Sequence, residues 1–66
     1  ALEELLRARM PFGKHAGWAL LDLPEPYLLW LVRRAEVGGR LGELLAAVLE
    51  IKTNGLEPLL APLRRP

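Results

Sequence analysis

Several residue types that catalysis or small-protein stability often requires are missing from this 66-residue sequence. It contains no cysteine and no serine, and its single histidine is His15. The absence of cysteine excludes a disulfide scaffold, and it leaves the redox compartment undetermined. The only side-chain hydroxyl groups belong to Tyr27 and Thr53, and Thr53 lies in a helix-ending motif where local capping is its expected role. We therefore expect that the protein is not an enzyme.

Metal and cofactor sites are not indicated either. One histidine and scattered carboxylates lack the spacing of metal ligands, so neither a metal nor a cofactor is expected. Glu43 and Glu50 are predicted to form a solvated ridge on one helix instead of a catalytic pair. The segment "FGKHAG" lacks the spacing of a nucleotide-binding phosphate loop, and it does not open a helix.

The sequence also lacks long runs of charged or of apolar residues. No 18 apolar residues occur together, so the sequence predicts no membrane span. The opening "ALEELLRAR" places acids before bases, unlike a signal peptide, and a cytoplasmic location is expected. The formal charge of +1 is too small to indicate a nucleic-acid-binding protein by itself. In contrast, 52% of the residues are hydrophobic, so the chain must pack its helices tightly or share apolar surface with another copy or a larger partner.

Hydrophobic periodicity predicts a single domain over residues 1–66 with four helices, at about residues 2–9, 24–36, 40–52 and 56–64. The third helix has a clear apolar stripe, formed by Leu41, Leu44, Leu45, Val48 and Ile51. The double glycine Gly38–Gly39 is expected to stop the second helix, and Thr53–Gly55 the third.

The segment between the first two helices has a different pattern. Two short apolar runs, "MPF" and "WALL", flank a loop with a glycine at each end. Because glycine adopts the positive φ that hairpin turns require, residues 10–21 are predicted to form a two-stranded β-hairpin. The predicted fold class is therefore α+β, a small mainly helical domain with one hairpin.

The aromatic side chains and the histidine are concentrated in residues 10–30, and we expect the hairpin to pack on the following helix. On that helix Trp30 lies between Arg33 and Arg34. Two interpretations stay open for Trp30, a buried framework position or an exposed stacking platform. Two also stay open for His15, which either joins Lys14 in contacting phosphate or covers neighbouring apolar surface.

The segments "MPFGKHAG" and "LLDLPEPYLLWL" resemble a signature of small bacterial proteins, some of them labelled quorum-sensing-regulated virulence factors. The signature is also similar to the C-terminal module of exonuclease X-like DNA nucleases. That resemblance implies an accessory role near nucleic acid, with Lys14 and His15 in the matching loop. It places the framework at Phe12, Leu23, Pro24, Tyr27, Leu28 and Trp30. Ala16 and Trp18 depart from the pattern, because the family often has lysine there, and each lost lysine removes a phosphate contact.

Together these observations predict a non-catalytic binding module, and two functions remain. The first is an accessory nucleic-acid-binding domain for single- or double-stranded DNA, with candidate residues Lys14, His15, Trp30, Arg33 and Arg34. The second is a protein-interaction or self-association module, most simply a homo-oligomer. It would use Leu29, Trp30 and the leucines of the two ends, Leu2, Leu5, Leu6 and those between Leu56 and Leu63. Salt separates the two, because phosphate contacts weaken with added salt whereas apolar association does not.

Overall fold

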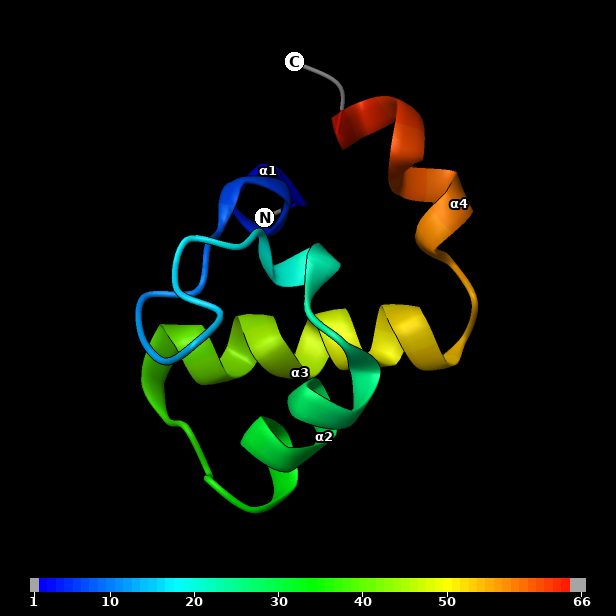
Figure 1. Ribbon diagram of the computed structural model, residues 1–66. Helices are drawn as coiled ribbons and strands as arrows, with labels where there is room; N and C mark the ends of the chain where they lie inside the picture. The colour runs from blue at the N-terminus through cyan, green and yellow to red at the C-terminus, as the bar shows by residue number, and fades with distance from the viewer. Residues whose placement is uncertain (1, 65–66) are drawn as a thin grey trace.

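The computed structural model describes residues 2–64 as a set of helices connected by short turns (Figure 1). The elements in chain order are α1 (Leu2–Arg7), the 3-10 helix η1 (Leu20–Asp22), α2 (Glu25–Arg33), α3 (Gly39–Thr53), α4 (Glu57–Leu60) and the 3-10 helix η2 (Ala61–Arg64). Figure 1 shows α3 across the middle of the molecule, with α2 on one side of it and α1 and α4 on the other.

The hydrophobic core forms around α3. Its inward face buries Leu44, Leu45, Val48 and Leu49, and Leu45 and Val48 have no exposed surface. Leu41 and Ile51 are partly buried against the same cluster, so the apolar stripe predicted for this helix is confirmed. The helix ends as its sequence indicates, since Asn54 is the C-cap and Gly55 has a φ of 67°.

The elements before α3 also contribute leucines to this core. The α2 helix buries Leu28 and Leu31, and α1 buries Leu5. Between them, the chain from Met10 to Leu23 adds four fully or nearly fully buried side chains, those of Met10, Leu20, Leu21 and Leu23. Burying a side chain of this size stabilises the fold by about 1.5–3 kcal/mol, so these residues replace the disulfide or metal that small domains often require.

The predicted two-stranded β-hairpin over residues 10–21 is wrong, and with it the α+β fold class. Within residues 2–64 no strand is present, and the only β-type pairing is an isolated antiparallel bridge between Arg9 and Ala19. The chain does reverse direction here, because the Met10 amide donates to the Trp18 carbonyl oxygen at 2.8 Å and the Leu20 amide donates to the Ala8 carbonyl oxygen at 3.1 Å. The fold is therefore helical with a closed loop.

Two local features explain why the loop forms no ladder. Pro11 has no amide hydrogen to donate, and the amides of Ala16 and Trp18 bond within turns, to the carbonyl oxygens of Gly13 and His15. Beyond the bridge, Leu20, Leu21 and Leu23 are all buried. A strand would direct neighbouring side chains to opposite faces, so this run of leucines favours the compact η1 turn.

The connection between α2 and α3 also differs from the prediction. The α2 helix ends at Arg33, before the expected boundary at residue 36, and Gly38 is the N-cap of α3. Glu36, with a φ of 50°, takes the left-handed conformation in this connection. The double glycine therefore begins the third helix and does not end the second.

The C-terminal elements are attached less firmly than the others. Neither α4 nor η2 contains a buried residue, although Leu60 packs partly against the core. An ion pair between Arg64 and Asp22, 2.8 Å long, links η2 to η1, and a second pair links Lys52 to Glu57 at 2.7 Å. In the part of the chain that the structure describes, no helix has the length and apolar character needed to cross a membrane.

Gly42 provides a test of the packing at the start of α3. A Cβ atom at this position would lie 2.0 Å from the Val37 carbonyl oxygen. Alanine normally stabilises a helix relative to glycine, but here the backbone must move to accept it, at a cost of about 1–3 kcal/mol. We expect Gly42→Ala to lower the melting temperature by at least about 4 °C.

Gly38→Ala is the matched control, because Gly38 has a negative φ and open space around its Cα. Because Gly38 is the N-cap of α3, where alanine is less favourable than glycine, the melting temperature of Gly38→Ala is expected to fall, but by less than that of Gly42→Ala. Equal melting temperatures for the two variants in thermal unfolding followed by circular dichroism would contradict the close approach of Val37 to Gly42.

Candidate nucleic-acid interface

The loop over residues 10–18 is closed on itself by hydrogen bonds at its base. The Gly17 amide donates to the Met10 carbonyl oxygen at 2.8 Å, and the Arg9 guanidinium donates to the Gly17 carbonyl oxygen at the same distance. Met10 is almost completely buried beneath the loop. These bonds hold the ends of the loop together, and between them His15 is the one buried residue of the segment 12–16.

The loop packs on α2 through a continuous series of rings, which we call the aromatic row: Trp18, His15, Tyr27 and Trp30. The His15 ring lies 4.7 Å from Trp18 in an edge-on arrangement and 4.4 Å from Tyr27 at an interplanar angle of 37°. Tyr27 and Trp30 are nearly parallel, with ring centroids 6.2 Å apart. The predicted packing of this segment on the Tyr27–Trp30 helix is thus confirmed, and His15 makes the connection.

His15 is buried, with 8% of its surface exposed. Its Nδ1 atom is the one buried side-chain nitrogen or oxygen in residues 2–64 that lacks a hydrogen-bond partner. The imidazole ring packs against the rings of Trp18 and Tyr27. The structure therefore favours the interpretation in which His15 covers neighbouring apolar groups.

Gly13 allows the loop to approach α2 closely. Its φ is 78°, and a Cβ atom at this position would lie 3.1 Å from the Tyr27 hydroxyl oxygen. Any other residue would meet both a strained backbone and the tyrosine. Because Lys14 lies between Gly13 and His15, both of which pack against Tyr27, the lysine is held next to the aromatic row, and its own side chain is exposed.

Three large aromatic side chains near this contact are accessible to solvent. Trp30 is 53% exposed, and Phe12 and Trp18 are each 46% exposed. Of the two interpretations of Trp30, the structure favours the exposed platform over the buried framework position. Sequence reasoning missed Phe12 and Trp18 as accessible groups, because a short apolar chain is expected to bury its large rings.

The cations near the aromatic row are exposed and unpaired. Among residues 2–64, Lys14, Arg33 and Arg34 take part in no ion pair, and all three are exposed. Arg33 and Arg34 follow Trp30 by three and four positions, so they are its neighbours on the helix surface. Four of the five predicted site residues are therefore accessible to solvent, and the fifth, His15, is buried.

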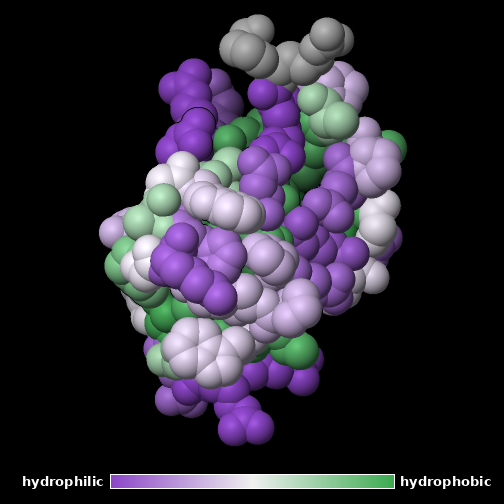
Figure 2. Space-filling model, viewed as in Figure 1, coloured by the Kyte–Doolittle hydropathy of each residue, from purple (hydrophilic) through white to green (hydrophobic). Residues whose placement is uncertain are grey.

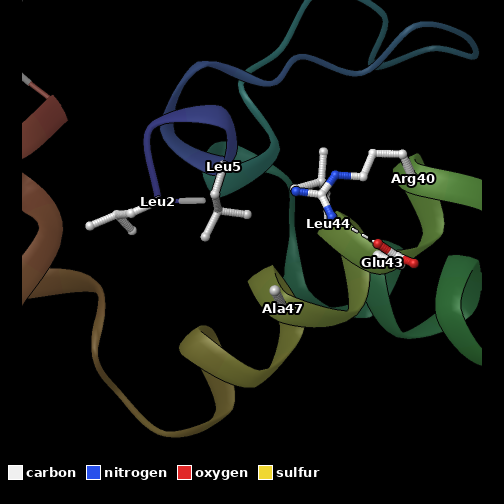
Figure 3. A pocket seen from close by; sticks show the side chains of 6 residues that line it. All are labelled: Leu2, Leu5, Arg40, Glu43, Leu44 and Ala47. Atoms are coloured by element: carbon white, nitrogen blue, oxygen red, sulfur yellow. Dashed lines mark hydrogen bonds and ion pairs between the residues drawn. The ribbon is translucent and has the colours of Figure 1, made fainter.

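A second feature is a shallow hollow of about 340 Å³ between α1 and α3 (Figure 3). Its floor is apolar, with Leu5 of α1 pointing toward Leu44 and Ala47 of α3. At its edge Arg40 bonds Glu43 at 2.8 Å and also forms an ion pair with Glu4 of α1. Because the charged groups at the edge already neutralise one another, this hollow presents no free catalytic or anion-binding group.

The described part of the chain can be compared with the requirements of a metal site and with the predicted role of Thr53 as a helix cap. No group of three His, Cys, Asp or Glu residues comes close enough to hold a metal ion in residues 2–64. The Thr53 hydroxyl donates to the Glu50 carbonyl oxygen at 3.1 Å, as expected for helix capping. The features that distinguish this small helical protein are its exposed rings and free cations.

Comparison with known proteins places the chain in a family. Residues 1–63 match the model of the family described as "Putative quorum-sensing-regulated virulence factor". The chain is 53% identical to the "Uncharacterized protein YpeB" of Escherichia coli strain K12, and equally to that of Escherichia coli O157:H7. Each alignment covers 98% of this chain and 92% of the relative. The protein belongs to this family. No solved structure matches it.

The ion pair between Glu4 and Arg40 predicts a pH dependence of stability. The hydrogen bond from Arg40 lowers the pKa of the Glu4 carboxyl below its ordinary value of 4.5. A carboxyl whose pKa is lowered by folding stabilises the protein above its ordinary pKa, and this contribution is lost as the pH falls through the lowered value. We therefore expect Arg40→Gln to lower the melting temperature at pH 7 and to have a smaller effect below about pH 4.

Thermal unfolding of both proteins between pH 7 and pH 2.5, at low salt, measures this difference. Arg33→Gln is the control, since it removes an exposed arginine that has no ion pair. A destabilisation by Arg40→Gln that stays constant over the whole pH range would show that the pair with Glu4 does not hold α1 to α3.

Proposed function

We propose that this protein is a non-catalytic module that binds nucleic acid through the aromatic row and the cations beside it. The observation that carries the proposal is the combination of the exposed Trp30 with three exposed and unpaired cations, Lys14, Arg33 and Arg34. Nucleic acid supplies the complementary groups, which are flat bases and regularly spaced phosphates.

The roles of the candidate residues differ in this proposal. Lys14, Arg33 and Arg34 contact phosphate oxygens, and Trp30 stacks on a base. His15 acts as a positioning residue, because it lies between Trp18 and Tyr27 and holds the loop against α2. With only three such cations, binding is expected to be of moderate affinity and to weaken with salt by about three units of slope.

The proposal includes an accessory biological role. The similarity of residues 10–30 to the C-terminal module of exonuclease X-like nucleases supports a function beside DNA-processing machinery, in the cytoplasm. The positions of Ala16 and Trp18, where the family often has lysine, indicate weaker phosphate binding in this chain than in such modules. Trp18 compensates in part, because it replaces a charge with an exposed ring.

The charge contribution is tested by changing Arg33 and Arg34 together to Ala. Each side chain is exposed, so the fold is expected to persist. Binding to a labelled DNA oligonucleotide, followed by fluorescence anisotropy, should weaken, and the dependence of log K on log salt should become shallower by about two units.

Arg64→Ala provides a control, because Arg64 already pairs with Asp22 and lies on η2, on the side of α3 opposite to α2 (Figure 1). This variant should keep its salt dependence. If the double variant binds DNA with unchanged affinity and salt slope, or if the original chain binds no nucleic acid at low salt, the proposed function is wrong.

A second candidate function is self-association. The C-terminal elements leave three leucines exposed, Leu56 at 42%, Leu59 at 71% and Leu63 at 56%. Of the leucines expected to serve association, Leu5 is buried and Leu6 and Leu60 are partly buried within the chain itself. The exposed set on α4 and η2 therefore favours contact between copies there, away from the aromatic row. The face shown in Figure 2 carries hydrophobic surface only in separate patches, between hydrophilic and intermediate residues.

For this second candidate we expect light scattering to report a homodimer at high micromolar concentration. Changing Leu59 and Leu63 together to Glu should convert it to a monomer, since each charge would be buried in the contact. Leu29→Glu makes the same change on α2, where Leu29 is 42% exposed, and should leave the dimer intact. A monomer mass for the original chain would exclude self-association.

A further inference from the structure

We infer that the ligand class of this site is single-stranded nucleic acid, bound by stacking of unpaired bases on Trp30 and Trp18 at the two ends of the aromatic row. The inference rests on the proposed function and narrows it. It also assigns a binding role to Trp18, which the sequence pattern gave only as a departure from lysine.

The first argument is the accessibility of the rings. Trp18 and Trp30 end the row, and each has about half of its surface exposed. In a duplex the faces of the bases are covered by their neighbours, so a protein ring meets an open base face only on a strand whose bases are free to unstack. Exposed tryptophans can therefore stack on the bases of a single strand but not on those of a regular duplex.

The ring contacts of the aromatic row restrict the movement of its two tryptophan side chains. His15 contacts both Trp18 and Tyr27, and Tyr27 in turn lies parallel to Trp30. The two tryptophans are thus connected by direct ring contacts between the loop and α2, and little side-chain freedom is left to lose on binding. Rings fixed in this way suit successive bases of one extended strand.

The third argument concerns what the surface lacks for reading a duplex. The α2 helix has nine residues. Among its exposed side chains, Leu29 and Trp30 offer no paired donor and acceptor groups for base edges, and Arg33 is the one long donor side chain. In the sequence, Lys14 precedes the rings of the aromatic row, and Arg33 and Arg34 follow them. A surface with few cations and several aromatic rings is typical of proteins that bind single-stranded nucleic acid without sequence preference.

The experiment compares one labelled oligonucleotide of about 12 nucleotides as a single strand and as its annealed duplex. Both are titrated with the full chain at about 50 and 200 mM salt, in DNA and RNA versions. We expect the single strand to bind at least about tenfold more tightly than the duplex. Because bases stack on the indoles, tryptophan fluorescence should change on adding the single strand and stay constant on adding the duplex.

Matched variants separate stacking from charge. Trp30→Leu removes the flat ring and should weaken single-strand binding by about 5- to 100-fold, whereas Trp30→Phe keeps a ring and should retain most of the affinity. Trp18→Leu and Trp18→Phe are expected to show the same contrast. Ala46→Ser is the control, because Ala46 is exposed on α3 and belongs to neither proposed surface, and this variant should bind as the original chain does.

The outcomes distinguish this inference from the proposed function. Equal affinity for single strand and duplex, together with weaker binding by the Arg33 and Arg34 variant, would retain nucleic-acid binding and overturn the single-strand assignment. Equal loss in the Leu and Phe variants would overturn stacking as its basis. Absence of binding to every oligonucleotide would overturn both. Circular dichroism confirms that each variant is folded, and the Phe variants keep the test valid if a Leu variant unfolds.

Discussion

The burial of apolar side chains from α2, η1 and the loop before it against α3 is the constraint on which this structure depends. Leu45 and Val48 are completely buried there, and with no disulfide in a 66-residue chain the apolar contact must supply the stability. The chain between Met10 and Leu23 adapts to this demand. Its methionine and leucines are buried in the core, and the residues between them form the closed loop. The position of the aromatic row is a consequence of that burial.

Periodicity was sufficient to predict the main helices and the buried stripe of α3, because a face of leucines repeated every three to four residues is typical of a helix packed on a core. It failed over residues 10–21. Glycines at positions 13 and 17 do take positive φ values, 78° and 89°, but the same signal fits a hairpin turn and a compact loop. Which one forms depends on whether Leu20 and Leu21 are buried together, and that is decided by tertiary contacts.

The candidate site was predictable in part. The helix that carries Trp30 and Arg33 was predicted from spacing alone, and the structure leaves both residues and the following Arg34 exposed. The burial of His15 and the exposure of Phe12 and Trp18 were not predictable, since they depend on how the loop lies on Tyr27. Residues 10–30 lie within the part of the chain that matches the family model, and their packing has a physical explanation. Gly13 permits the close approach, His15 fills it, and Tyr27 receives both.

The C-terminal elements have a consequence for the dynamics of the molecule. The α4 and η2 helices bury no residue and are joined to the rest mainly by Leu60 and two ion pairs, Arg64–Asp22 and Lys52–Glu57. They therefore lose the fewest contacts when they detach. Their amides should exchange with solvent deuterium through local opening, well before those of α3 do so through global unfolding. The segment of α4 and η2 is therefore expected to open locally more often than the rest of the molecule, which includes the aromatic row.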